Sequence, residues 1–283
     1  MRPHPLHRKL LAPMGAMLLA AAPLAARAGA PAARTAAASA PAAEPAQPPP
    51  RRATAEERAM AERLEPLARA TFWAHQIQID PRDVQAGVRL AAALRALGRN
   101  DEAASAAEQV LVVDPANRDA LLESARAHLA AGQGFYAIGP LEKLRAMDAR
   151  DWRYVSLLGV AYEQVSRTAE AETAWREALQ LSPDNPAILS NLAMHYAARG
   201  EASEAERLLR QAAAQPNAGL QVRQNLALIL GLEGKLAEAE SLERQDLPPE
   251  LADANMAYLK AATSGPHALA DAGRLAAGPA ATR

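Results

Sequence analysis

The feature of this sequence that most constrains its fold is an internal repeat with a period of about 34 residues. Such a period is the signature of a chain built from stacked copies of one small supersecondary unit, because a single copy cannot bury its apolar face alone. Small or apolar residues keep this register through five copies. The columns are Ala103, Ala137, Ala171, Ala205 and Ala239; Gly98, Gly132, Ser166, Gly200 and Gly234; Leu90, Ser124, Leu158, Leu192 and Leu226; and Ala91, Ala125, Gly159, Ala193 and Ala227.

Composition indicates that the repeated unit is helical. Hydrophobic residues make up 50% of the 283 residues, but aromatic residues make up only 4%, and alanine supplies most of the apolar count. Alanine is the strongest helix former, whereas strands favour β-branched and aromatic side chains. We therefore expect an all-α chain without long β-sheets.

The best copy of the repeat, residues 155–183, resembles the tetratricopeptide pattern, with Val155 where that family often has tryptophan. The resemblance implies a right-handed α-solenoid of antiparallel helix pairs. We expect about five repeats within residues 55–261, with an extra helix or partial repeat over 55–79. A final helix, from Pro249 to Ala261, should cover the open end of the last repeat.

The repeat columns also predict local packing. Gly159 and Ala171 should lie where the two helices of a repeat cross, because a larger side chain would force the helices apart. Tyr162 and Trp175 should fill the space between that repeat and its neighbours. The glycine column should close each first helix with a left-handed residue, so Ser166 is expected to be the least comfortable of these turns.

Both ends of the chain differ in composition from the repeats. Residues 1–28 combine a basic start, an apolar stretch and a small-x-small sequence at Ala26 to Ala28, which predicts a secretory signal cleaved before Gly29; the alternative is an uncleaved anchor. Residues 29–54 are rich in alanine and proline and predict a disordered linker, and residues 262–283 predict a disordered tail. We expect no transmembrane segment in the mature chain.

The sequence offers little that points to catalysis. It contains no cysteine, and its six histidines form no metal-binding motif, so we expect no metal and no cofactor. His128 occupies a packing column, which favours a structural role. The run from Gly132 to Tyr136 lacks the residues of a phosphate-binding loop and should be a turn. An enzyme built on the solenoid is the least favoured hypothesis.

Charge and spacing point instead to a protein partner. Beyond residue 53 the chain carries 24 Lys/Arg and 31 Asp/Glu, a net charge of -7, which argues against nucleic acid. Asparagines at equivalent helical positions could hydrogen-bond an extended peptide, or alternatively hold the backbone of the next repeat. The predicted peptide-binding groove consists of Arg153, Ser156, Val160, Asn191, Met194, Gln224, Asn225 and Asn255.

The segment from Arg223 to Leu259 resembles the closing part of TadD-type proteins, the tetratricopeptide component of Flp (tight-adherence) pilus assembly. This resemblance implies a non-enzymatic scaffold for the pilus secretion machinery, with other cell-envelope proteins as partners. Many relatives resemble lipoproteins, but this chain lacks the cysteine that would carry the lipid. A periplasmic protein, with at most peripheral association with the outer membrane, is therefore expected. The alternative is a general exported adaptor for another envelope complex.

Overall fold

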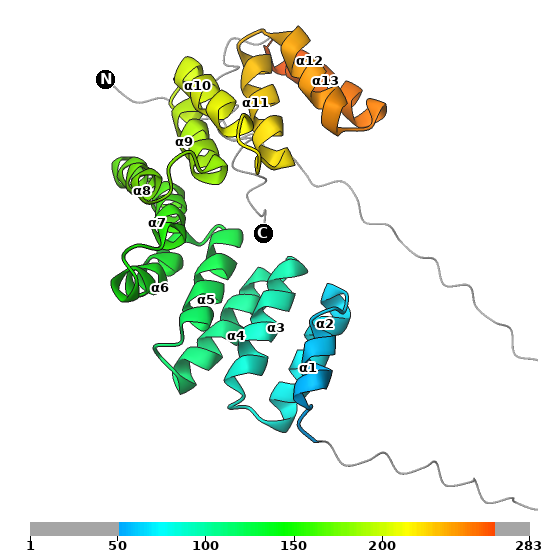
Figure 1. The fold of residues 1–283 in the computed structure, drawn as a ribbon, viewed down its shortest axis with the longest axis vertical. Helices are drawn as coiled ribbons and strands as arrows, with labels where there is room; N and C mark the ends of the chain where they lie inside the picture. The colour runs from blue at the N-terminus through cyan, green and yellow to red at the C-terminus, as the bar shows by residue number, and fades with distance from the viewer. Residues whose placement is uncertain (1–50, 264–283) are drawn as a thin grey trace, which may run out of the picture. The chain divides into compact units, whose positions relative to one another are not determined.

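A computed structural model describes residues 51–263 as a succession of α-helices with no strand in that range (Figure 1). The predicted signal, most of the predicted linker and residues 264–283 lie outside the described residues. The helices are α1 (Ala55–Ala61), α2 (Pro66–Ile79), α3 (Val84–Ala96), α4 (Asn100–Val113), α5 (Arg118–Ala130), α6 (Gly134–Met147), α7 (Trp152–Gln164), α8 (Thr168–Leu181), α9 (Pro186–Ala198), α10 (Ala202–Ala213), α11 (Leu220–Leu232), α12 (Leu236–Asp246) and α13 (Pro249–Thr263).

The period of the sequence is reproduced in the helix boundaries. The first helices of the five repeats, α3, α5, α7, α9 and α11, begin one full period apart, and so do the second helices, α4, α6, α8, α10 and α12. Each helix packs against the helices before and after it, and first helices also contact the first helix of the next repeat. The predicted all-α solenoid of helix pairs is confirmed.

A column of helix caps, which the sequence analysis overlooked, sets where the first helices begin. Asp83, Asn117, Asp151 and Asn185 precede α3, α5, α7 and α9, and each side-chain oxygen accepts a hydrogen bond from a backbone N–H of the first turn. Such caps satisfy donors that have no partner within the helix. In the fifth repeat the position is Gly219, which provides no side-chain cap for α11.

The glycine column closes the first helices as predicted. Gly98, Gly132, Gly200 and Gly234 have φ angles of 73°, 72°, 81° and 80°, in the left-handed region that glycine adopts at little cost. Ser166 holds the same position in the third repeat with a φ of 62°. A Cβ disfavours this region of φ by roughly 1–2 kcal/mol, which is consistent with the expectation that the Ser166 turn has the least favourable backbone energy of the five.

Replacing Ser166 with glycine is therefore expected to stabilise the protein. The gain in backbone energy exceeds the extra entropy that glycine loses on folding, and the balance is about 0.5–1 kcal/mol. Urea unfolding followed by circular dichroism measures it. Gly132→Ser is the matched reverse change, because a Cβ at Gly132 meets no atom within 4 Å, and it should destabilise by a similar amount. A less stable Ser166→Gly variant would contradict this account.

Gly159 lies where α7 and α8 cross, as predicted, and the side chain that fills the space is Trp175 of α8. A Cβ on Gly159 would come within 2.5 Å of Trp175 Nε1. The indole N–H donates a hydrogen bond of 3.1 Å to the carbonyl of Ser156, and the indole is 3% exposed. Trp175 also packs edge-on against His195 of α9, so it joins two neighbouring repeats.

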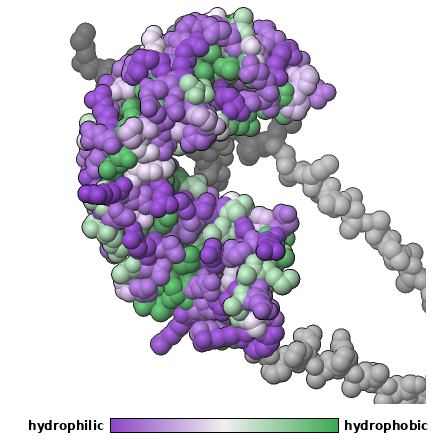
Figure 2. Space-filling model, viewed as in Figure 1, coloured by the Kyte–Doolittle hydropathy of each residue, from purple (hydrophilic) through white to green (hydrophobic). Residues whose placement is uncertain are grey.

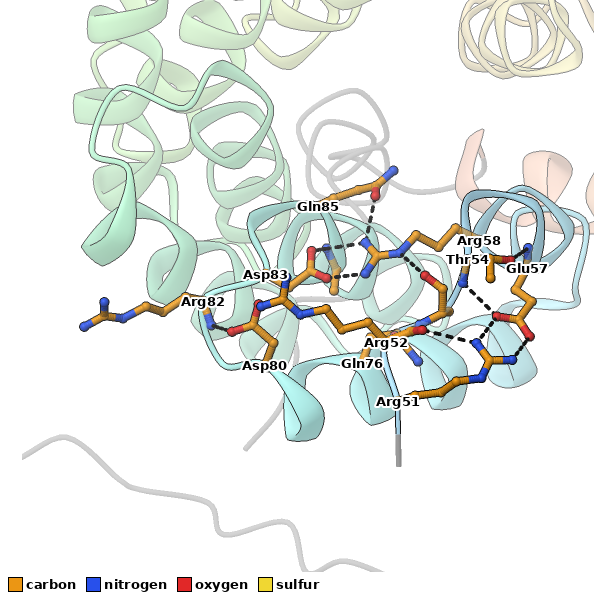
Figure 3. A network of polar contacts seen from close by, with 12 residues as sticks. Arg51, Arg52, Thr54, Glu57, Arg58, Gln76, Asp80, Arg82, Asp83 and Gln85 are labelled. Carbon is orange, nitrogen blue, oxygen red and sulfur yellow. Dashed lines mark hydrogen bonds and ion pairs between the residues drawn. The ribbon is translucent and has the colours of Figure 1, made fainter. Parts of the chain in front are cut away.

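The N-terminal end of the solenoid includes four residues that the sequence analysis assigned to the linker. Residues 51–54 contact α1: the Arg51 guanidinium lies 2.7 Å from the Glu57 carboxylate, and Thr54 caps the helix. These residues therefore belong with the repeat domain (Figure 3). The expected extra helices over residues 55–79 are α1 and α2.

A second ion pair in this region joins α1 to the start of α3 (Figure 3). The Arg58 guanidinium donates to both carboxylate oxygens of Asp83, and the two side chains are only 14% and 10% exposed. Burial alone would raise the pKa of Asp83. The hydrogen bonds from Arg58 and from the Ala86 backbone N–H outweigh it, and the pKa lies below its ordinary value.

The C-terminal end is covered as expected. Leu247 and Pro248 separate α12 from α13, and Pro249 is the first residue of α13. This helix packs against α11 and α12 through Ala252, Met256 and Leu259, which are all buried. Close packing here depends on another glycine, since a Cβ on Gly231 would come within 2.7 Å of the Leu259 side chain.

Candidate peptide-binding cavity

The third, fourth and fifth repeats together form a cavity of about 470 Å³, which we call the α7–α11 cavity. Its walls come from three first helices, α7, α9 and α11, and from one residue of α8. The walls combine apolar side chains and amides with one carboxylate and one imidazole. The lining residues are Val160, Glu163, Gln164, Trp175, Asn191, Met194, His195, Ala198, Gln221 and Asn225.

Four of the eight residues predicted for the groove line this cavity. They are Val160 of α7, Asn191 and Met194 of α9, and Asn225 of α11. Three different repeats contribute them, and the structure brings them together because equivalent positions of successive first helices face the same side of the array.

The other four predicted residues are not on the cavity walls. Arg153 is exposed and pairs with Asp151, and Ser156 is buried at 6% exposure with its carbonyl bound by Trp175. Gln224 is half-buried on α11, and Asn255 lies on α13. Position in the repeat alone did not separate the residues that line the cavity from others on the same helices or on α13.

The three asparagines differ in what they contact. Asn225 donates to Ser190 Oγ at 2.9 Å and accepts from Gln221 Nε2 at 2.9 Å, so it joins α11 to α9. Asn255 donates to Glu243 Oε2 at 2.8 Å and joins α13 to α12. Asn225 and Asn255 thus hold neighbouring helices together, as in the alternative to peptide binding, although their partners are side chains and not backbone. Asn191 has no side-chain hydrogen bond within the described residues, and its amide is available to a ligand.

His195 is a wall residue that the sequence analysis missed. Its side chain is fully buried, and Nδ1 lies 2.9 Å from Glu163 Oε2. Nε2 has no hydrogen-bond partner among the described residues and lies 3.7 Å from Glu172 Oε2. The period could have revealed it, because the equivalent positions hold buried apolar residues. These are Ala93, Ala127, Ala161 and Ile229.

Glu172 of α8 stands behind His195, outside the cavity lining. Burial would raise the pKa of Glu172. The hydrogen bond from the Tyr196 hydroxyl and the charge of Arg176 lower this pKa by more than burial raises it, so the net shift is downward. The carboxylate therefore remains ionised at neutral pH. His195 is held between this group and Glu163.

The structure agrees with the sequence on two features that could have suggested chemistry. His128 is buried at 8% exposure and contacts Glu108 and Gln133, both at 2.9 Å, in keeping with a structural role. Gly132 and Gln133 lie in the turn between α5 and α6 as predicted, whereas Gly134, Phe135 and Tyr136, which were also assigned to the turn, are the first residues of α6. Residues 51–263 contain no cluster of side chains suited to a metal ion, and none of their helices has the length and apolar character to span a bilayer.

Helix pairs repeated at a constant period, with a cavity shared by three of them, define an α-solenoid of the class that serves as a protein-interaction scaffold. The particular unit is the tetratricopeptide repeat. One profile of this repeat matches residues 88–134 and 137–186, and a second matches residues 164–227, so the chain contains tetratricopeptide repeats.

Solved structures share this fold. A thermophilic tetratricopeptide protein of Thermus thermophilus is 26% identical, with a TM-score of 0.56 over 63% of this chain and 99% of that one. MamA from Desulfovibrio magneticus, residues 41 to its end, is 20% identical, with a TM-score of 0.50 over 55% of this chain and 90% of that one. No curated protein sequence matches the chain.

Proposed function

We propose that the protein is a non-enzymatic scaffold that binds an extended segment of a partner protein in the α7–α11 cavity. The observation that carries this proposal is the Asn191 amide, which lines a cavity between repeats and has no hydrogen-bond partner among the described residues. An amide offers both a donor and an acceptor to a peptide backbone. The apolar side chains of Val160 and Met194 on the same walls can pack against a partner side chain.

We further propose that this scaffold is exported and takes part in assembling or localising the Flp pilus secretion machinery. Two features of the sequence support this: the resemblance of residues 223–259 to TadD-type proteins, and the signal-like residues 1–28. Without a cysteine the chain cannot carry the lipid anchor of a lipoprotein, so we place it in the periplasm. A general exported adaptor for another envelope complex is the alternative.

The binding proposal is tested by Asn191→Ala. The lost amide should weaken capture of the partner about three- to tenfold, the equivalent of one hydrogen bond, and leave the melting temperature unchanged or slightly raised, because alanine favours helices. Asn225→Ala is the matched control: it should lower stability, because Ser190 and Gln221 lose their partner. If a folded Asn191→Ala protein captures the partner as well as the unaltered protein does, the assignment of the α7–α11 cavity as the binding site is wrong.

The cellular proposal is tested with the same captures, made from the periplasmic fraction after cross-linking. Mass spectrometry should find Gly29 as the first residue of the mature protein, and secretin or other pilus secretion components among the cross-linked partners. If fewer pilus secretion components are cross-linked to the Asn191→Ala variant, the cavity is linked to the pilus secretion machinery. A full-length cytoplasmic product, or partners from an unrelated envelope complex, would exclude the pilus role.

A further inference from the structure

We infer that the α7–α11 cavity selects a partner segment carrying a lysine or arginine side chain. The inference rests on the proposed function and names the chemistry of the ligand. Of the residues that line the cavity, only Glu163 is an acid and none is Lys or Arg. The one fixed charge on the walls is therefore negative.

The Glu163 carboxylate is placed to accept a second donor. Its Oε2 lies 2.9 Å from His195 Nδ1, whereas its Oε1 has no hydrogen-bond partner among the described residues. The side chain is 33% exposed, so a ligand can reach it while the surrounding protein limits its contact with water. Charge-assisted hydrogen bonds of this kind are stronger than those between neutral groups.

The neighbouring walls suit the aliphatic stem of a long basic side chain. Val160 and Met194 line the cavity and pack at the edge of the core that includes Trp175. Lysine and arginine bury their methylene groups along apolar surface and keep the charged head at a polar site. The free amide of Asn191 offers the head group a further oxygen acceptor.

The charge of the rest of the protein favours the same ligand. The described residues contain 24 Lys/Arg and 30 Asp/Glu, a net charge of -6. The face shown in Figure 2 is mainly hydrophilic, with its hydrophobic residues in small separate patches, so no large apolar surface competes as a docking site there. A negative protein attracts a basic segment before contact is made.

The test compares two blocked nonapeptides of alanine and serine that differ only at the central residue, lysine in one and norleucine in the other. Norleucine keeps the stem and lacks the ammonium group. Protein labelled at its methionine methyl groups reports binding, because Met194 lines the cavity while Met60, Met147 and Met256 do not. The titrations are run at about pH 8, where an ordinary imidazole is neutral.

The lysine peptide should bind about three- to fivefold more tightly than the norleucine peptide, as expected for a partly exposed ion pair, and should shift the Met194 signal selectively. Added salt should reduce this preference. Glu163→Gln should abolish the preference while keeping an acceptor for His195. Glu108→Gln is the matched control: it removes the carboxylate beside His128 at the same 2.9 Å distance, outside the cavity, and should retain the preference.

Each outcome distinguishes this inference from the proposed function. Equal binding of the two peptides at Met194 would overturn the selection of a basic residue but leave peptide binding in the cavity standing. A preference that persists in Glu163→Gln would overturn the role of that carboxylate. No shift at Met194 with either peptide would overturn both. The comparison of peptides on the unaltered protein needs no variant to fold.

Discussion

Gly159→Leu is expected to destabilise the third repeat by about 2–5 kcal/mol. The new side chain would occupy the place of the Trp175 indole, which already lies 2.5 Å from the position of a Cβ. Overpacking costs about 1–3 kcal/mol, and displacing the indole leaves its buried N–H without the Ser156 carbonyl at a similar cost. Because Trp175 also contacts the fourth repeat, unfolding should lose cooperativity.

Thermal and urea unfolding, followed by circular dichroism and by tryptophan fluorescence, measure this effect. The matched control is Gly139→Leu on α6, where an added Cβ meets nothing within 4 Å. That change should raise stability slightly, since leucine is the better helix former. An unchanged unfolding curve for Gly159→Leu would place the helix crossing elsewhere.

Asp83→Ala is expected to destabilise the N-terminal end by about 3–5 kcal/mol, because it leaves the buried Arg58 guanidinium unpaired. It also removes the cap of α3, which is worth about 1 kcal/mol and is partly included in that figure. Hydrogen exchange should rise most in α1, α2 and α3. The later repeats should keep their protection, since each repeat contacts only its neighbours.

The control for this change is a neighbouring carboxylate with an exposed partner. Asp80 pairs with Arg52, whose side chain is 67% exposed, at 2.6 Å. Asp80→Ala should therefore cost about 1 kcal/mol or less, as is usual for surface ion pairs. Equal losses from the two variants would show that burial of the Arg58–Asp83 pair contributes nothing.

The sequence predicted the fold almost in full because the information is local and repeated. A glycine in the same position of nearly every repeat marks where the first helix ends, and Pro248 and Pro249 mark the start of the last helix. The small-residue column placed Gly159 at a helix crossing, but the contact between Gly159 and Trp175 within the repeat was not predicted, because Trp175 was expected to fill the space between repeats. The period did not reveal the order at residues 51–54, which depends on ion pairs with distant positions such as Asp80.

The candidate site was predicted only in part. Four of the eight predicted groove residues line the α7–α11 cavity, because position in the repeat determines which side of the array a residue faces, and their role in binding stays a prediction. Asn225 and Asn191 are equivalent in sequence, and so are Ser190 and Ser156, but only the Asn225–Ser190 pair forms a hydrogen bond in the structure, so the sequence alone could not show which amide is free. Glu163 and His195 were missed because they lie in different repeats, 32 residues apart in sequence, and are paired only in the folded structure.

The missing cap at Gly219 has a consequence for how a ligand could enter. Gln221 and Asn225, which line the cavity, lie in the first two turns of α11, the one first helix of the five repeats without a side-chain cap. A helix start without a cap frays more readily than a capped one, and α11 lacks the side-chain hydrogen bond that holds the first turns of α7 and α9. We therefore expect the first turn of α11 to unwind more often than those of α7 and α9, which would give a ligand access from this side of the cavity.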